Sequence, residues 1–169
     1  MNQSELTRRF AARFASASTR RPPHLLARLA ALLPASACAI AAAQPGAALP
    51  VVALAADGHA IRAEVARTSD ERTHGLMLRK HVDVDAGMLF VFGDPQVQCF
   101  WMHDTLIPLS VAFIADDGRI VNVVDMAPRT ETSHCSTRPV RFVLEMNQSW
   151  FAQHGIAAGG FVTGEPFTR

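Results

Sequence analysis

The chain of 169 residues lacks several sequence signatures that would indicate a reaction. Its three cysteines form no Cys-x-x-Cys pair, and neither a phosphate-binding P-loop nor the glycine pattern of a dinucleotide-binding fold occurs. The Gly-x-Ser-x-Gly elbow of α/β-hydrolases and the paired-histidine helix of metalloproteases are missing as well. The sequence therefore predicts no cofactor, and it favours a non-enzymatic protein over a catalyst.

Only one apolar run approaches the length of a membrane span. Leu29 to Ala43 is uncharged, but it is shorter than the ~20 residues that a bilayer core requires, and Pro34 interrupts it. Six arginines precede this run, against one acidic residue, Glu5. A basic stretch, a short apolar run and then small residues are typical of a secretory signal. We therefore expect residues 1–43 to be a signal peptide and the protein to be periplasmic or secreted.

Two cleavage positions fit this leader. Cleavage after Ala43 follows three small residues and is the simpler expectation. Cleavage after Ala37 would leave Cys38 first, and the residues before it resemble a lipoprotein box that has Ala35 where leucine is usual. The protein would contact a membrane only if Cys38 were lipidated.

Removal of the leader changes the sign of the net charge. The whole chain has 16 basic and 15 acidic residues, and residues 1–43 hold six of the former and one of the latter. The remaining 10 basic and 14 acidic residues give a net charge near −4, whereas the full chain has +1. Because phosphate binding needs a basic surface, nucleic acid is not an expected partner.

The remaining chain is predicted to be a single β domain over 50–164, between a flexible lead-in at 44–49 and a tail at 165–169. The run Gly87 to Ile114 has two apolar stretches around a Cys-Phe-Trp-Met-His-Asp-Thr cluster and is too interrupted for a helix. Asp57-Gly58 is a hairpin turn signal between two strand-like runs. Strands are expected over 51–55, 59–65, 88–92, 97–103, 109–114, 119–126 and 140–146, and a turn with a last strand over 156–162.

Two short helices complete this prediction. Thr68 and Glu71 have the spacing of a capping box, so one helix should begin there. Asn147 can cap a second helix over 148–153. The expected fold is therefore mainly β with two short helices, arranged as a small antiparallel sandwich or barrel of the jelly-roll kind.

Four motifs in order resemble those of domain of unknown function 192, an uncharacterised prokaryotic family. They are Gly75-Leu76-Met77-x-Arg79, Gly87-Met88-Leu89-Phe90-x-Phe92, Phe100-Trp101-Met102-x-x-Thr105-Leu106-Ile107-Pro108-Leu109 and Glu145-Met146-Asn147. The resemblance implies a small, mainly β domain that is often exported and has no established activity. His103-Asp104 replaces the usual Lys-Asn, and Ser110 replaces the usual Asp, so no role of those residues carries over.

We expect structural roles for six of the motif residues. Arg79 is predicted to pair with an acidic residue in 83–94, and Asn147 to cap the second helix. The six residues are Met77, Arg79, Gly87, Pro108, Glu145 and Asn147.

Cysteine gives the sharpest chemical prediction. If Cys38 leaves with the leader, Cys99 and Cys135 remain, and two cysteines in an exported domain are usually bridged. Closing such a loop stabilises a fold by about 4 kcal/mol in the chain-entropy model. The bridge would attach strand 97–103 to the polar loop over 127–139.

A metal site is the competing interpretation of the same region. Cys99 and His103 would share one strand face, with His134 and Cys135 as the other candidate ligands. Adjacent residues such as His134 and Cys135 rarely point at one ion, which weighs against this set.

A hydrolase-like enzyme is the second alternative, using His103, His134 and nearby acidic residues. The titratable or nucleophilic side chains available to it are Asp104, Ser110, Asp125 and Glu145. Neighbouring strand residues point to opposite faces, so His103 and Asp104 would not pair directly within one regular strand.

Strand alternation supplies the preferred functional hypothesis. Cys99, Trp101 and His103 should face one way, and Phe100 and Met102 should enter the core. A surface with one aromatic ring and a few polar groups can hold a small ligand or an envelope component. The candidate binding residues are Trp101, His103, Asp104 and Thr105. The plainer interpretation is that Trp101 only packs against the bridge.

Overall fold

The computed structural model describes residues 48–167, and the predicted signal peptide and Cys38 lie outside them. Within this range the chain forms nine strands and two short helices. The strands are β1 (Val51–Ala56), β2 (His59–Ala66), β3 (Ala86–Gln96), β4 (Cys99–Phe100), β5 (Leu109–Ile114), β6 (Ile120–Met126), β7 (His134–Cys135), β8 (Val140–Asn147) and β9 (Val162–Thr163). The helices are α1 (Ser69–His74) and α2 (Trp150–Gln153). Neither helix in 48–167 is long and apolar enough to span a bilayer.

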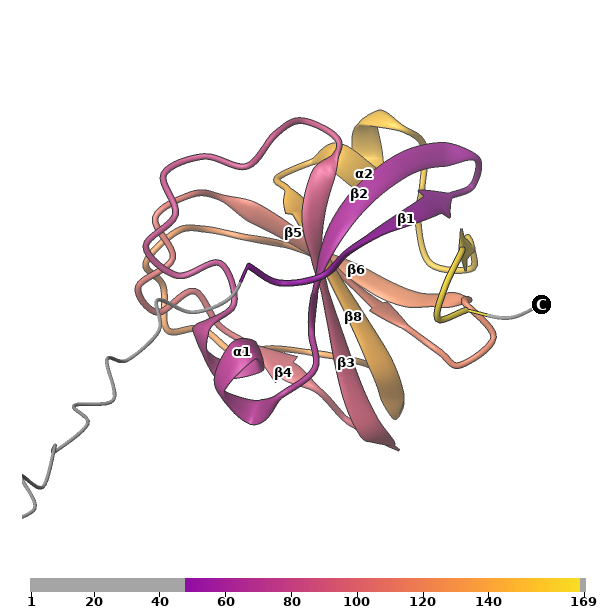
Figure 1. The fold of residues 1–169 in the computed structure, drawn as a ribbon, viewed down its shortest axis with the longest axis horizontal. Helices are drawn as coiled ribbons and strands as arrows, with labels where there is room; N and C mark the ends of the chain where they lie inside the picture. The colour runs from indigo at the N-terminus through magenta and orange to yellow at the C-terminus, as the bar shows by residue number, and fades with distance from the viewer. Residues whose placement is uncertain (1–47, 168–169) are drawn as a thin grey trace, which may run out of the picture. The chain divides into compact units, whose positions relative to one another are not determined.

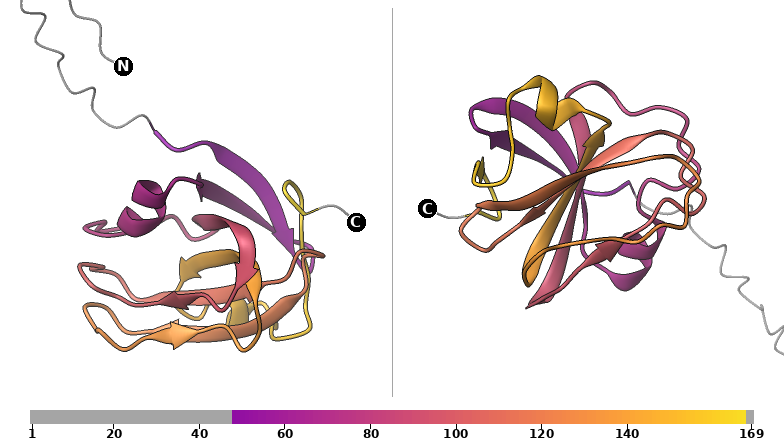
Figure 2. Two further views of the ribbon diagram at one scale, coloured as in Figure 1. Left: turned by 90° about the horizontal axis from the view of Figure 1, so that it is seen from below. Right: turned by 180° about the vertical axis from the view of Figure 1, so that it is seen from behind.

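Seven strands form one curled sheet in the order β6-β5-β8-β3-β2-β1-β9 (Figure 1). The mainly β class with two short helices is confirmed, but the sheet is mixed, because β2 and β3 run parallel. Parallel neighbours need a crossover connection, and α1 with the loop after it supplies that connection. Figure 2 shows the β1–β2 hairpin on one side of the curl and β5, β6 and β8 on the other.

The hairpin turns lie where the sequence predicts them. Asp57 and Gly58 join β1 to β2 with φ values of 44° and 90°, the left-handed conformations that a two-residue hairpin turn requires. Gly118 has a φ of 83° in the turn between β5 and β6. Glycine accepts these angles without the steric cost that other residues incur there.

The two helices begin differently. The capping box before α1 is confirmed, because Thr68 Oγ1 accepts from Glu71 N and the Glu71 carboxylate accepts from Thr68 N. The prediction for α2 is wrong: Ser149 is its N-cap residue. Asn147 is still in β8, where its side-chain amide donates to the backbone oxygens of Asp83 at 2.9 Å and Val82 at 3.2 Å. Asn147 therefore attaches the loop before β3 to β8.

The central strands bury both faces. Phe142, Leu144 and Met146 of β8 enter one hydrophobic cluster, together with α2 and parts of β1 and β2. Val143 enters a second cluster on the opposite face, with Phe90 of β3 and residues of β5. This two-sided burial explains why Leu109–Ile114 is apolar with almost no alternation.

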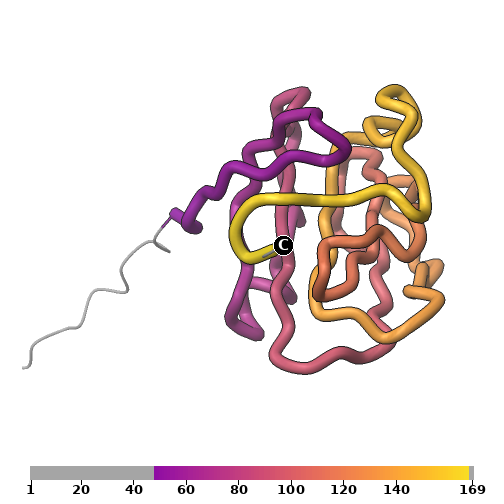
Figure 3. Tube along the Cα trace, turned by 90° about the vertical axis from the view of Figure 1, so that its right-hand side faces the viewer, coloured from indigo at the N-terminus to yellow at the C-terminus, as the bar shows by residue number. Residues whose placement is uncertain are grey.

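The C-terminal part of the domain closes the first cluster. The turn and last strand expected over 156–162 lead into β9, Val162–Thr163, which pairs antiparallel with β1 (Figure 3). Its short pairing follows from the turn before it, where Gly159 has a φ of 95° and Gly160 donates to the Ala157 carbonyl. Phe167 packs edge-on against Phe142, with ring centroids 4.8 Å apart.

The strand expected over 97–103 is the largest error of the sequence prediction. Only Cys99 and Phe100 form β4, which pairs with β7 in a separate two-stranded sheet. The chain then turns at Asp104, whose φ is 53°. The stretch 97–107 is therefore mostly irregular, and it covers the second cluster by inserting Met102, which is fully buried.

We predict that Gly87→Ala destabilises the domain by about 2–3 kcal/mol or more, because a new methyl group would overpack the sheet. A Cβ on Gly87 would lie 2.2 Å from the Glu145 carbonyl oxygen and 2.5 Å from Met146 Sδ. Gly93 is the matched control, since it lies in the same strand with nothing within 4 Å of an added Cβ. Urea unfolding should show Gly93→Ala within about 0.5 kcal/mol of wild type. Equal stability of the two variants would contradict this account of β3–β8 packing.

Candidate functional site

A cavity of about 390 Å³ lies against the second hydrophobic cluster. Its walls come from α1 and the turn after it, from β3, and from the stretch 98–101. The lining residues are Ser69, Arg72, Thr73, His74, Gly75, Leu76, Met77, Phe90, Phe92, Gln98, Cys99, Phe100, Trp101, Thr105 and Glu145. All four sequence motifs therefore contribute to the cavity. The first three supply at least two lining residues each, and the fourth supplies Glu145.

Glu145 is the buried acidic group of this cavity. It lies in β8 directly opposite Met88 on one side and Val111 on the other, both fully buried. Only 5% of the Glu145 surface is exposed. Its carboxyl group has no hydrogen bond or ion pair within 48–167. In the same range, every side-chain nitrogen or oxygen that is fully shielded from solvent does have a partner. The carboxyl oxygens are therefore not fully shielded, and they reach the cavity that Glu145 lines.

Burial raises the pKa of Glu145 to about 8. The cause is desolvation, which penalises the charged carboxylate and leaves the neutral acid favoured. At neutral pH the cavity therefore holds a carboxylic acid that can both donate and accept a hydrogen bond. A structural role was expected for Glu145, and the sequence prediction did not place it in a cavity. A signal for its position on an inward-facing strand face was present, because Glu145 shares that face with Val143.

The rim contains two of the four predicted binding residues. Trp101 is 52% exposed, and Thr105 is 6% exposed; both line the cavity. His103 and Asp104 do not line it. Because the chain turns here, His103 and Asp104 come within 3.4 Å of each other, which a regular strand would have prevented.

His103 supports the rim from outside. Its ring stacks on Trp101 with centroids 5.1 Å apart and an interplanar angle of 20°. Its Nδ1 lies 3.3 Å from a carboxylate oxygen of Glu131. The backbone oxygen of His103 also accepts from the Thr105 hydroxyl at 3.3 Å. His103 therefore positions Trp101, and the expectation that Trp101 only packs against the disulfide does not hold.

Helix α1 supplies the opposite wall. The guanidinium of Arg72 lies over the Phe92 ring, 4.9 Å from its centroid, and donates to the Val91 carbonyl at 3.1 Å. Gly75 follows the helix, and a Cβ there would lie 3.2 Å from the Phe90 ring. The missing side chain of Gly75 thus lets the helix end approach β3 closely.

The remaining motif residues connect these walls. Arg79 forms a two-pronged pair with Glu64 of β2 at 2.5 and 2.6 Å, so the expected acidic partner in 83–94 is wrong. The hydrogen bond from Arg79 is the main reason that the pKa of Glu64 is lowered. Leu78 N donates to the Asp104 carbonyl at 2.9 Å, which joins the turn after α1 to the rim. The Pro108 carbonyl accepts from Gln148 N at 3.2 Å.

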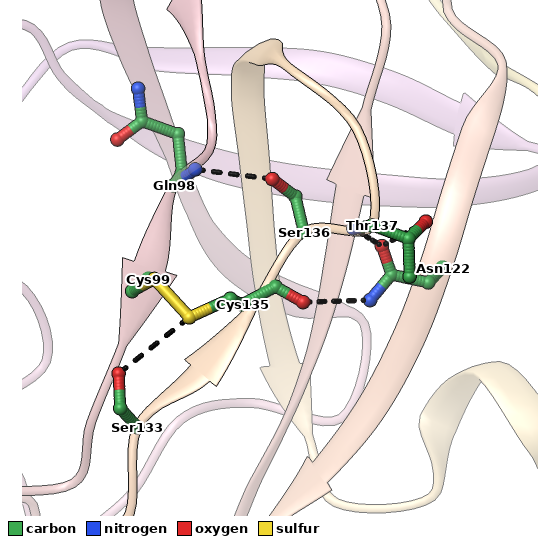
Figure 4. Close-up of a disulfide and its surroundings, with 7 residues drawn as sticks. All are labelled: Gln98, Cys99, Asn122, Ser133, Cys135, Ser136 and Thr137. Carbon is green, nitrogen blue, oxygen red and sulfur yellow. Dashed lines mark hydrogen bonds between the residues drawn. A yellow bond between two sulfur atoms is a disulfide. The ribbon is translucent and has the colours of Figure 1, made fainter.

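The cysteine prediction agrees with the structure, in which Cys99 and Cys135 are bonded across β4 and β7 (Figure 4). Ser136 Oγ accepts from Gln98 N at 3.1 Å, and Asn122 of β6 donates to the Cys135 carbonyl at 3.2 Å. Because Cys99 also lines the cavity, the bridge attaches one cavity wall to the main sheet.

The proposed metal site is not assembled in residues 48–167. Two of the four proposed metal ligands, Cys99 and Cys135, are bonded to each other and have no thiolate to offer. Residues 48–167 contain no group of three or more His, Cys, Asp or Glu side chains placed to hold a metal. Ser110 is fully buried and donates to the Asp125 carboxylate, while its oxygen accepts from Ser149 N. That arrangement joins β5 to β6 and to the start of α2, and it includes no histidine.

Comparison with known proteins agrees with the motif resemblance. Residues 52–164 match the family described as DUF192, uncharacterized ACR, and the chain belongs to this family. A crystal structure described as a putative transcription regulator from Sinorhizobium meliloti 1021 is similar, with 31% identity and a TM-score of 0.69; the match covers 71% of this chain and 98% of that one. A protein of unknown function from Novosphingobium aromaticivorans has 35% identity and a TM-score of 0.67, covering 72% and 91%. No curated protein matches the chain.

We predict that Glu145 makes the domain less stable as the pH rises. The pKa of this group is 4.5 in the unfolded reference and about 8 in the fold, so the folded state binds more protons between these values. Stability from this source is complete below about pH 4.5 and is lost as the pH rises through 8. The free energy of unfolding, measured with urea across this pH range, should fall in the wild type relative to Glu145→Gln. The fall should be at most about 1.4 kcal/mol per pH unit. Parallel pH profiles of the two proteins would contradict the assignment.

Proposed function

We propose that this domain binds a small ligand in the cavity between α1, β3 and the stretch 98–101. The observation that carries the proposal is the Glu145 carboxyl group, which is buried, has no partner within 48–167 and reaches the cavity. Burial of this carboxyl group disfavours its charged form. A ligand that hydrogen-bonds to Glu145 can offset this cost on binding.

The dimensions and the walls of the cavity support a small ligand rather than a large one. Its volume of about 390 Å³ lies within the ~300–1,000 Å³ that is typical of small-molecule sites. Four aromatic side chains, Phe90, Phe92, Phe100 and Trp101, line the cavity, and polar side chains among the other lining residues could fix the orientation of a ligand. Trp101 lies at the rim, where it could cover a bound small molecule. It could also contact a larger envelope component of which one chemical group enters the cavity.

We also propose that the protein works outside the cytosol. The basic and apolar pattern of residues 1–43 supports export. The Cys99–Cys135 bond supports it as well, because such bonds persist in oxidising compartments and are rare in the cytosol. Cleavage after Ala43 is the simpler form of this proposal, and lipid attachment at Cys38 is the other.

Transcription regulation, named for one structural relative, finds less support in this chain. Residues 44–169 carry an excess of acidic over basic residues, which opposes binding to a phosphate backbone. The two helices of 48–167 have six and four residues, too short to provide a recognition helix.

We predict that Trp101→Ala weakens ligand binding. A thermal-shift screen of the purified full-length chain should yield ligands that raise the melting temperature, and Trp101→Ala should reduce that shift because one wall of the cavity is lost. Val84→Ala is the matched control, since Val84 is an exposed apolar residue that does not line the cavity. A ligand whose shift survives Trp101→Ala unchanged would place binding elsewhere.

We predict that the native protein loses its leader and has no free thiol when it is isolated from its own cell. Intact mass should correspond to a chain that begins at Gln44, or at a lipidated Cys38, with Cys99 and Cys135 inaccessible to alkylation until reduction. Cell fractionation should place it with exported proteins. Recovery of the unprocessed chain from the cytosol with both thiols alkylatable would contradict export.

A further inference from the structure

The buried acidic group of the cavity has no counter-ion among residues 48–167. Two basic side chains line the same cavity, Arg72 and His74, and both come from α1. Neither contributes to the raised pKa of Glu145, for which burial alone accounts. The other polar lining residues from α1, the stretch 98–101 and the rim are uncharged, and Cys99 is bonded to Cys135. An ionised Glu145 would therefore depend on a positive charge from outside residues 48–167.

The walls around this group suit a cation. Phe90, Phe92, Phe100 and Trp101 line the cavity, and aromatic ring faces attract cations electrostatically. Arg72 already occupies this kind of position over Phe92, 4.9 Å from the ring centroid. Its guanidinium is held there by backbone oxygens, so a positive charge is stable beside this wall.

We propose that the cavity binds a small organic ammonium ion, with the ammonium group at Glu145 and an apolar body against Phe100 and Trp101. This inference rests on the proposed function, because it names the ligand class of the same cavity. The positive charge of Arg72 on the α1 side disfavours a second cation there and directs the ammonium group toward Glu145. The apolar body then lies toward the exposed rim at Trp101.

Proton release accompanies this binding. Before binding, Glu145 is protonated at neutral pH; on binding, its O–H bond breaks and the proton passes to the buffer. The resulting carboxylate accepts a hydrogen bond from the ammonium N–H, so one positive charge enters the cavity as one proton leaves it. Below the pKa of Glu145, affinity for an ammonium ion should therefore rise up to tenfold per pH unit.

The test compares three probes of similar shape: 2-phenylethylammonium, 2-phenylethanol and 3-phenylpropionate. Isothermal titration of the full-length chain in two buffers of different ionisation enthalpy measures both affinity and proton release. We expect 2-phenylethylammonium to bind about tenfold or more tightly than 2-phenylethanol at pH 7, with release of about one proton. Between about pH 6 and 8 only the ammonium probe should gain affinity.

Variants assign this behaviour to Glu145. Glu145→Gln should abolish the preference for the ammonium probe and its proton release, while weaker binding of 2-phenylethanol remains. Glu165→Gln is the control, since it removes an exposed carboxylate that neither lines the cavity nor contacts its rim. Far-ultraviolet circular dichroism and urea unfolding verify that both variants are folded.

Four results would overturn the inference. Two concern affinity: equal or tighter binding of the alcohol or the carboxylate, or no binding of any probe at millimolar concentration. The other two are the absence of proton release and an ammonium preference that persists in Glu145→Gln. A neutral or anionic ligand whose thermal shift depends on Trp101 would overturn the ammonium class and leave the proposed ligand-binding function intact. Loss of the dependence on Trp101 for every ligand would instead contradict the proposed function itself.

Discussion

The architecture depends on covering both faces of β8 and its two neighbours. Successive residues of β8 enter opposite clusters, Leu144 on one side and Val143 on the other. Helix α2 and the C-terminal segment cover one face with regular packing. The other face is covered by the largely irregular chain over 97–107. The connections that hold this cover include the Cys99–Cys135 bond, hydrogen bonds between Gln98 and Ser136, and backbone hydrogen bonds from Met102 to Thr130, from Leu78 to Asp104 and from Arg129 to Thr105.

Glu145 is the exception on this second face, and the exception gives the cavity its chemistry. A carboxyl group between Met88 and Val111 disfavours the folded state, and an apolar side chain of similar volume would suit the same position better. Natural proteins tolerate such losses where the group serves binding or catalysis. The proposed ligand supplies the missing hydrogen-bond partner, so the cost in stability and the gain in binding come from the same carboxyl group.

Much of the fold could be predicted because local sequence signals agree with it. The Asp57-Gly58 turn and the Thr68–Glu71 capping box depend on contacts between near neighbours, and both were found. The parallel pairing of β2 with β3 was missed, since a six-residue helix and a loop give little sign of a crossover. The site was only half predicted. The alternation of side chains along a strand correctly placed Met102 in the interior and Trp101 at the surface. It did not hold for the residues after them, because the chain turns at Asp104 and the strand-like alternation ends there. The partners of Arg79 and Asn147 lie far away in sequence, where single-chain patterns carry no information.

Export and ligand binding, although proposed on separate grounds, meet at Cys99. This residue lines the cavity and is also bonded to Cys135, whose carbonyl accepts a hydrogen bond from Asn122 of the main sheet. The bridge thus connects the wall next to Trp101 to β6. In a reducing compartment the bond would be absent, and the irregular stretch 97–107 would lose its covalent connection to β7. A preorganised wall costs less to order when a ligand binds. The oxidising environment proposed for this protein is therefore also the one in which this cavity wall would be preorganised.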